Sequence, residues 1–347
     1  MKETGSGLRK KIRTSQIMLT LLSVFLLVFS AIQYIYIYRT ENVIRVRFED
    51  DVISAVQLSE YYEQKKEEPD IPDITLWKLK EQAEVSTEDC SRVDGFALIE
   101  GYGDLGKVMP DRLVEGGYPV KSDTDGCALS EAGAKALFGS SDVVGKPLKF
   151  GGKEYIIRGI VKSGKRMLWI QNPAAGFPFA EMSYPDRVAA SDAKGWLMQQ
   201  GYGEPKVMLS GGDYSAFNFL FITLPVWVFC IHYYFNLKRT VRRFTNRYVG
   251  YGLTFLWSAG LIVLIFAGIK YSFRFSLDYI PTRWSDFGFY SGLAAQLAES
   301  ARSIAEYKRL PGDAELLMHS RYSAYCAWGS LALMIGAVTR RGRKQAK

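Results

Sequence analysis

Histidine and cysteine are scarce in this sequence. Its 347 residues include two histidines, His232 and His319, and four cysteines. Zinc sites built on paired histidines are therefore excluded. Four cysteines in a chain of this length also exclude a small disulfide-rich scaffold. Aromatic residues make up 14% of the chain, a content that excludes intrinsic disorder.

Signatures of catalysis are missing as well. The chain has no glycine-rich loop that ends in Gly-Lys-Ser or Gly-Lys-Thr, the motif that cradles nucleotide phosphates. It also lacks a Gly-x-Ser-x-Gly nucleophile motif, a His-Glu-x-x-His metal motif and the protein-kinase signatures. We expect no catalytic residue, no metal site, no cofactor and no enzymatic activity. Any ATP hydrolysis must then be supplied by a separate subunit.

Charge is absent from four apolar windows, residues 16–38, 214–237, 252–269 and 322–338. The first window has 23 residues, and a helix of that length spans about 34 Å, enough for the apolar core of a bilayer. It is also longer than the apolar region of a cleaved signal peptide, so we interpret it as an uncleaved anchor. The last window is at the short end for a spanning helix. We predict four transmembrane helices.

Basic residues predict how these helices are oriented. Fifteen Lys and Arg residues, with Glu3 as the one acidic residue among them, lie in the two terminal tails and in the loop 238–251. Basic residues in short flanking segments stay on the cytoplasmic side of a membrane. Both termini and this loop are therefore predicted to be cytoplasmic, which leaves residues 39–213 and 270–321 on the extracytoplasmic side.

The pattern within residues 39–213 changes near Pro72. Before it, residues 40–66 carry apolar side chains near helical spacing, such as Phe48 and Val52, and predict a helix. After it, the apolar runs are short, alternating or β-branched, and glycine and proline interrupt them. The strands expected there are 74–79, 95–100, 127–129, 146–150 and 155–161. This segment is predicted to be an α+β domain.

The predicted fold class is an α-helical membrane protein with an α+β extracytoplasmic domain between its first and second spans. The order is a cytoplasmic basic tail (1–15), span one (16–38), the extracytoplasmic domain (39–213), span two (214–237), a cytoplasmic basic loop (238–251), span three (252–269), an extracytoplasmic loop with an amphipathic helix (270–321), span four (322–338) and a cytoplasmic basic tail (339–347).

The net charge of +8 does not indicate nucleic-acid binding, because its distribution is uneven. Residues 39–213 contain 22 basic and 29 acidic residues, so the large extracytoplasmic segment has a net charge of −7. The basic residues lie beside the spans instead, where they suit the anionic head groups of a lipid bilayer. We expect the bilayer, and no nucleic acid, among the partners.

Residues 112–161 carry the most informative local signals. Ser130 is expected to cap a short helix that ends at Gly139. Gly151 and Gly152 tolerate the positive φ of a two-residue turn, so the runs on either side of them are expected to pair as a hairpin. The predicted order is turn, strand, short helix and hairpin.

This stretch resembles the extracytoplasmic core domain of MacB/FtsX-type ABC transporter permeases. The matching segments are Gly116–Pro119, Ser130–Gly139, Asp142–Leu148 and Gly151–Val161, and residues 8–21 are similar to that family's entry into its first span. The resemblance implies a multi-pass subunit of a bacterial inner (cytoplasmic) membrane that forms a homo- or heterodimer. It would couple a separate ABC-type ATPase to movement of its extracytoplasmic domain, for export or mechanotransmission.

The resemblance also suggests where the ATPase would bind. Basic residues before span one and after span two would contact it: Arg9, Lys10, Lys11, Arg13, Lys238, Arg239, Arg242, Arg243 and Arg247. In that second position the family carries a longer docking helix with a Glu-Ile-Gly core, which residues 237–251 lack. The alternative function is a non-enzymatic membrane sensor or assembly protein whose extracytoplasmic domain binds a ligand or an envelope protein.

An amphipathic helix is expected between spans three and four. Within Asp286–Leu310, the apolar residues Leu293, Leu297 and Ile304 share one face. This face could lie on the membrane or pack on the extracytoplasmic domain. We expect it to pack on its own protein.

Two of the four cysteines, Cys90 and Cys127, lie in the predicted extracytoplasmic domain, where thiols can oxidise. No third cysteine competes there, so these two could form a disulfide. The bond requires a short Cα separation that a sequence does not reveal, and free thiols are the alternative. Cys230 and Cys326 lie in apolar windows and are expected to behave as small apolar residues.

Overall fold

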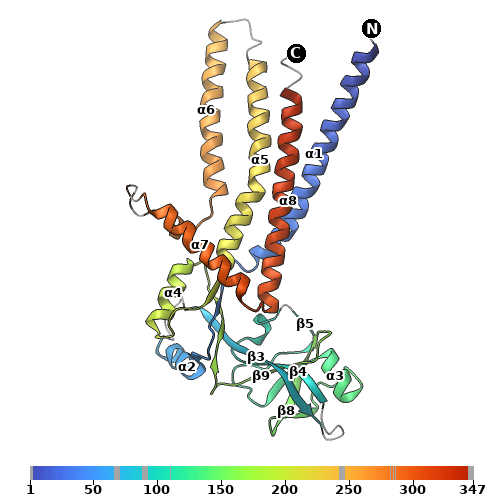
Figure 1. Cartoon of the computed structure of the whole chain (residues 1–347), viewed down its shortest axis with the longest axis vertical. Helices are drawn as coiled ribbons and strands as arrows, with labels where there is room; N and C mark the ends of the chain where they lie inside the picture. Colours follow the sequence, from blue (N-terminus) through green and yellow to red (C-terminus); the bar gives the residue numbers. More distant parts are fainter. Residues whose placement is uncertain are drawn as a thin grey trace. The chain divides into compact units, whose positions relative to one another are not determined.

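The chain folds into two compact units, a helical unit and a mixed α/β domain (Figure 1). The computed structural model describes residues 3–65, 71–87, 93–109, 111–241, 247–281, 283, 285 and 287–342. The helical unit takes the described residues within 1–41, 211–279 and 316–347. The domain takes those within 42–210 and 280–315, so it includes residues that follow the third predicted span.

Four long helices and the short 3-10 helix η2 (Leu277–Tyr279) form the regular structure described in the helical unit. The long helices are α1 (Glu3–Tyr38), α5 (Gly211–Val241), α6 (Arg247–Ser272) and the greater part of α8 (Pro311–Gly342). Three of these helices contain a stretch long and apolar enough to cross a membrane: Thr14–Tyr38, Gly211–Phe235 and Tyr251–Ser272. These stretches overlap the first three predicted spans and support a membrane protein.

Helix α8 contains the fourth predicted window, 322–338, but it is not among the candidate spans found in the described residues. Its composition explains this difference. Tyr322, Tyr325 and Trp328 occupy the first half of the window together with serine and glycine, and they lower its mean hydropathy. Three spans are therefore supported, and the fourth stays a prediction.

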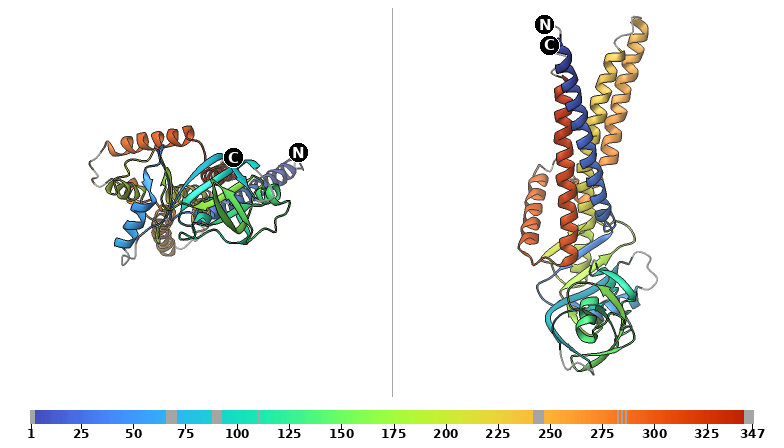
Figure 2. Two further views of the ribbon diagram at one scale, coloured as in Figure 1. Left: turned by 90° about the horizontal axis from the view of Figure 1, so that it is seen from below. Right: turned by 90° about the vertical axis from the view of Figure 1, so that its right-hand side faces the viewer.

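Helices α1 and α8 lie side by side in the helical unit (Figures 1 and 2) and are joined by two pairs of serines. The Oγ atoms of Ser23 and Ser330 are 2.9 Å apart, and each hydroxyl is also within 2.9 Å of the other residue's backbone carbonyl. Seven residues later in α1 and seven residues earlier in α8, Ser30 Oγ donates to the carbonyl of Ser323 at 2.8 Å. All four side chains are fully buried. Small hydroxyl-bearing residues allow such close approach of two helices.

The domain is built on a ten-stranded mixed sheet. Its path runs β12-β1-β11-β3-β4-β9-β6-β8-β5, and β7 pairs with β3 and β8 beside that path. The strands are β1 (Val43–Arg47), β3 (Asp73–Ser86), β4 (Val93–Tyr102), β5 (Arg112–Gly116), β6 (Gly126–Ser130), β7 (Pro147–Phe150), β8 (Lys153–Lys162), β9 (Met167–Gln171), β11 (Phe179–Ser183) and β12 (Val207–Ser210). The β4–β9 and β6–β8 pairs are parallel and the other pairs are antiparallel. A separate small sheet pairs β2 (Ile53–Ser54) with β10 (Gly176–Phe177).

Four helices pack with these strands: α2 (Ala55–Gln64), α3 (Glu131–Phe138), α4 (Ala190–Gln199) and α7 (Phe289–Glu306). One apolar core joins β1 to α2 and α4, and it includes Ile44, Leu58 and Leu197. A second core lies under α3 and includes Leu137 and Ile157. The sheet therefore has helices packed at two separate places along its path, as Figure 1 shows for α2 and α3.

The local predictions for residues 126–162 are confirmed. Ser130 Oγ accepts a hydrogen bond from Gly133 N at 3.0 Å and caps α3, which ends at Gly139 with a φ of 68°. Strands β7 and β8 pair across Gly151 and Gly152, whose φ values are 58° and 81°. These are left-handed conformations that glycine adopts without steric cost.

The predicted helix over 40–66 is wrong in its first half. Residues 43–47 form strand β1, and helix α2 begins only after its cap, Ser54. The strand forms because the β-branched residues Ile44 and Val46 are two positions apart, which puts both side chains in the core on one face of the sheet. Of the residues that follow this strand in the predicted range, only those of α2 form a helix.

Helix α7 packs against β12, which is an edge strand of the sheet. Covering an edge strand blocks unwanted pairing with other chains. Its half-buried apolar residues are Phe289, Leu293 and Ile304. The expected packing of this segment on its own protein is thus present, but it covers part of the helix surface only.

The serine pairs predict a specific disulfide in a variant chain. In a background with Cys230 and Cys326 replaced by alanine, the Ser23→Cys/Ser330→Cys variant should cross-link efficiently under mild oxidation, because these positions already touch. The cross-link would be measured as a reducible shift on a denaturing gel. The matched control is Val24→Cys/Ser330→Cys, since Val24 is exposed on α1. Equal cross-linking of both pairs would show that the α1–α8 register is wrong.

Candidate functional site: a buried ion cluster in the domain

Strand β1 places two arginines on the sheet face opposite the core that contains Ile44 and Val46. Side chains alternate across a strand, so Arg45 and Arg47 share that other face. Strand β1 pairs with β11 in a register that sets Arg45 directly across from Glu181. The alternation of β1 and its pairing with β11 therefore bring two cations to one acid.

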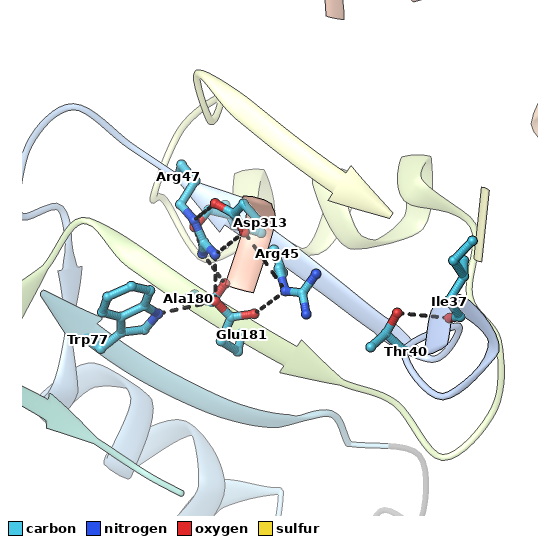
Figure 3. Close-up of polar contacts among 9 residues, drawn as sticks. Ile37, Thr40, Arg45, Arg47, Trp77, Ala180, Glu181 and Asp313 are labelled. Atoms are coloured by element: carbon cyan, nitrogen blue, oxygen red, sulfur yellow. Dashed lines mark hydrogen bonds and ion pairs between the residues drawn. The ribbon is translucent and has the colours of Figure 1, made fainter. Parts of the chain in front are cut away.

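Arg47 is held by two carboxylates (Figure 3). Its Nη2 lies 2.6 Å from Glu181 Oε1 and 2.7 Å from Asp313 Oδ1, and its Nε lies 3.0 Å from Asp313 Oδ2. The remaining nitrogen, Nη1, donates to the carbonyls of Val46 at 3.0 Å and Ala180 at 3.2 Å. The exposed fractions of the Arg47, Glu181 and Asp313 side chains are 1%, 2% and 4%. The guanidinium group is thus fully hydrogen-bonded away from water.

Arg45 and Trp77 complete the site, which we call the Arg47 cluster: Arg45, Arg47, Trp77, Glu181 and Asp313. Arg45 Nε lies 3.1 Å from Glu181 Oε2 and 3.9 Å from Asp313 Oδ1. Trp77 Nε1 donates to Glu181 Oε1 at 3.2 Å. Two positive and two negative groups give the cluster no net formal charge. Buried charges persist in proteins when they are paired and hydrogen-bonded in this way.

Aromatic rings shield the guanidinium group of Arg47. Its central carbon lies 5.5 Å from the ring centre of Trp77 and 5.6 Å from that of Phe179. These two rings meet edge to face at 4.9 Å, and Tyr307, just after α7, meets Phe179 at 6.5 Å. Cations are attracted to aromatic faces, and the attraction grows when water is excluded.

The electrostatics of the cluster keep Arg47 charged. Burial by itself lowers the pKa of Arg47, but the charges and hydrogen bonds of Glu181 and Asp313 raise it by more, so the pKa lies above its ordinary value. Asp313 also lies in the first turn of α8, where the helix dipole favours a negative charge. The cluster therefore joins the start of α8 to strands β1 and β11.

This arrangement suits attachment, not chemistry. The Arg47 guanidinium donates to four partners, and the buried ions are out of reach of a substrate in solution. Among the described residues, no group of three or more His, Cys, Asp or Glu side chains is placed to hold a metal ion. What the cluster can do is hold the first turn of α8 to the sheet.

The predicted ATPase-contact residues lie at the ends of the long helices or outside the described residues. Arg9, Lys10, Lys11 and Arg13 belong to α1, Lys238 and Arg239 to the last turns of α5, and Arg247 begins α6. Arg242 and Arg243 are outside the described residues. The binding role of all nine stays a prediction.

The structure describes only one of the two cysteines of the predicted disulfide. Cys127 lies on β6, fully buried in the core under α3, and burial raises the pKa of its thiol to about 12. Cys90 is outside the described residues. Their pairing stays a prediction.

The Arg47 cluster was not predicted from the sequence, although two local signals for it exist. Arg45 and Arg47 alternate with buried β-branched residues, which is typical of a strand with charged groups on one face. Asp313 follows Pro311 and Gly312, an order that is typical of the start of a helix. Neither signal reveals that these side chains meet.

Comparisons with known proteins give matches among solved structures only. No family model matches the sequence, and no curated protein matches it. The periplasmic region of MacB from Actinobacillus actinomycetemcomitans is similar with a TM-score of 0.40 and 13% identity, covering 50% of this chain and 90% of that one. The extracellular domain of the noncanonical ABC-type transporter YknZ from Gram-positive bacteria is similar with a TM-score of 0.33 and 14% identity, covering 46% of this chain and 89% of that one.

Breaking the cluster should destabilise the fold. The Asp313→Asn variant leaves the buried Arg47 with one carboxylate fewer, and loss of a partner in a buried ion pair costs about 3–5 kcal/mol. The cost would be measured as the free energy of unfolding of the full chain in detergent micelles.

The matched control is Glu81→Gln. Glu81 pairs with Lys308 on the surface of the same domain, where solvent weakens the ion pair, so this change should have little effect. If Asp313→Asn were no more destabilising than Glu81→Gln, the cluster would not be an important contact.

Proposed function

We propose that this chain is a permease-like membrane subunit of an ABC transporter, and that it couples a separate ATPase to movement of its extracytoplasmic domain. The observation that carries the proposal is how the long helices attach to the sheet. Strands β12, β1 and β11 are neighbours, and each is linked to a different long helix.

Two of these links are covalent. Residues 39–42 alone separate the end of α1 from β1, and α5 begins at the residue after β12. The third link is the Arg47 cluster, which attaches the first turn of α8 to β1 and β11. All three helices are therefore attached directly to neighbouring strands at one edge of the sheet. In this proposal, movement of the helices would be passed to the domain at that edge.

The remaining parts of the proposal follow the sequence resemblance. The chain would cross a bacterial inner membrane four times, with α8 supplying the fourth span and both termini in the cytoplasm. It would work as a homo- or heterodimer. The basic residues at the cytoplasmic ends of α1, α5 and α6 would bind the ATPase, and the domain would engage the substrate or a partner outside. Hydrolysis would occur on the ATPase, so the chain itself would have no catalytic site.

A second candidate function is a membrane sensor or assembly protein with the same fold and no motor. The connection between α5 and α6 favours it. Residues 237–251 lack the Glu-Ile-Gly core of the family's docking helix. The domain would then bind a ligand or an envelope protein and transmit no force from ATP.

Co-purification from native membranes would distinguish the two functions. We expect the tagged full chain to recover an ABC-type ATPase. The variant Lys238→Gln/Arg239→Gln/Arg242→Gln/Arg243→Gln should lose most of it, because the proposed contact is electrostatic. Recovery would be measured by quantitative mass spectrometry.

The matched control is Arg340→Gln/Arg341→Gln/Arg343→Gln/Lys344→Gln, which removes the same charge from the C-terminal tail and should retain the ATPase. Cysteine-labelling from each side of the membrane would verify that both variants keep the wild-type topology. An envelope protein recovered with the wild-type chain in place of an ATPase would reject the transporter proposal and support the second function.

A further inference from the structure

Helix α7 presents an apolar stripe that nothing covers in the part of the chain that the structure describes. None of its residues is fully buried, and its half-buried apolar side chains are on one side only. The adjoining stripe consists of exposed residues at helical spacing, Tyr290, Ala294, Leu297, Ala301 and Ala305. The exposed fractions of Tyr290 and Leu297 are 59% and 40%. The charged residues of α7, Glu299, Arg302 and Glu306, lie on the opposite side of the helix.

Helix α7 is close in the sequence to the ends of two long helices. Helix α7 packs on β12, and the residue after β12 is Gly211, where a candidate span begins. Upstream, the candidate span of α6 ends at Ser272, and downstream α8 begins at Pro311. The stripe therefore belongs to a segment that follows one candidate span in the sequence and packs on the strand that directly precedes another.

The chemistry of the segment matches an interfacial position. Residues 287–298 contain no charged side chain, and three of their first four residues are aromatic. Phe287, which directly precedes α7, is 92% exposed. A phenylalanine exposed to this extent in water is unfavourable, whereas aromatic residues are enriched where a protein meets the surface of a bilayer.

We propose that the stripe on α7, together with Phe287, lies in the lipid–water interface of the leaflet next to this end of the spans. The helix would lie along the membrane with Tyr290 and Leu297 among the lipids and Glu299 and Arg302 in water. Because α7 carries two acidic residues and one basic residue, its contact would be with the apolar part of a neutral phospholipid and would not need anionic head groups. This inference requires no ATPase and is independent of the proposed function.

Spin labels on the full chain in phosphatidylcholine nanodiscs would test the proposal. In a chain without its native cysteines, Leu297→Cys and Glu299→Cys would each carry one label on opposite sides of α7. Accessibility to oxygen, which concentrates in lipid, would be compared with accessibility to a water-soluble nickel complex. We expect oxygen to dominate at Leu297→Cys and nickel to dominate at Glu299→Cys.

Each other outcome would overturn the proposal. Dominance of nickel at both positions would mean that the stripe faces water. Shielding of Leu297→Cys from both reagents would mean that a protein covers it, either a second copy or a partner.

A second measurement keeps the native cysteines, because replacement of buried Cys127 could impair folding. A photoreactive benzoyl-phenylalanine at position 297 should form phospholipid adducts in native membranes, detected as a mass increase of one lipid. The same group at position 299 should form few. Adducts to protein at position 297, or no adducts there, would contradict the lipid contact.

Discussion

A guanidinium group that is removed from water needs hydrogen-bond acceptors and negative charges within the protein. The architecture of the domain depends on this requirement. Arg47 is almost completely buried, so the free energy lost on dehydration has to be recovered from Glu181, Asp313 and two backbone carbonyls. Those partners belong to separate strands and to a helix late in the chain. The requirement of one side chain therefore fixes where β1, β11 and the start of α8 meet.

The same two helices are constrained a second time in the helical unit. There, α1 and α8 share the serine pairs, while in the domain β1, which follows α1, shares the Arg47 cluster with the first turn of α8. Helix α8 runs from Pro311 to Gly342, so both sets of contacts involve this one helix. Separation of α8 from α1 and its strand would require both sets to break.

The sequence predicts this fold where the determining signals are local. The cap at Ser130, the helix end at Gly139 and the turn at Gly151 and Gly152 each act within a few residues, and the structure has all of them. Strand β1 was not predicted from the sequence. The apolar residues that follow it have helical spacing, and the helix predicted from them was taken to include the two buried β-branched residues of β1. The three candidate spans were recognisable from length and absence of charge alone.

The candidate site could not be predicted from the sequence, for a different reason. Arg47 is 134 residues from Glu181 and 266 residues from Asp313. Their contact depends on strand order and on the return of the chain after α7, and neither is encoded in the composition around any one of these residues. The register of β1 with β11 is what brings these arginines to Glu181.

The spacing of the serines has a consequence for how the α1–α8 pair can move. Sliding one helix by a single heptad, about 10.5 Å, would put Ser23 beside Ser323 but leave Ser30 facing Leu316, an apolar residue without a matching hydroxyl. Only one axial alignment satisfies both hydroxyl pairs. Piston-like sliding between these two helices is therefore disfavoured, while joint tilting keeps every hydroxyl satisfied.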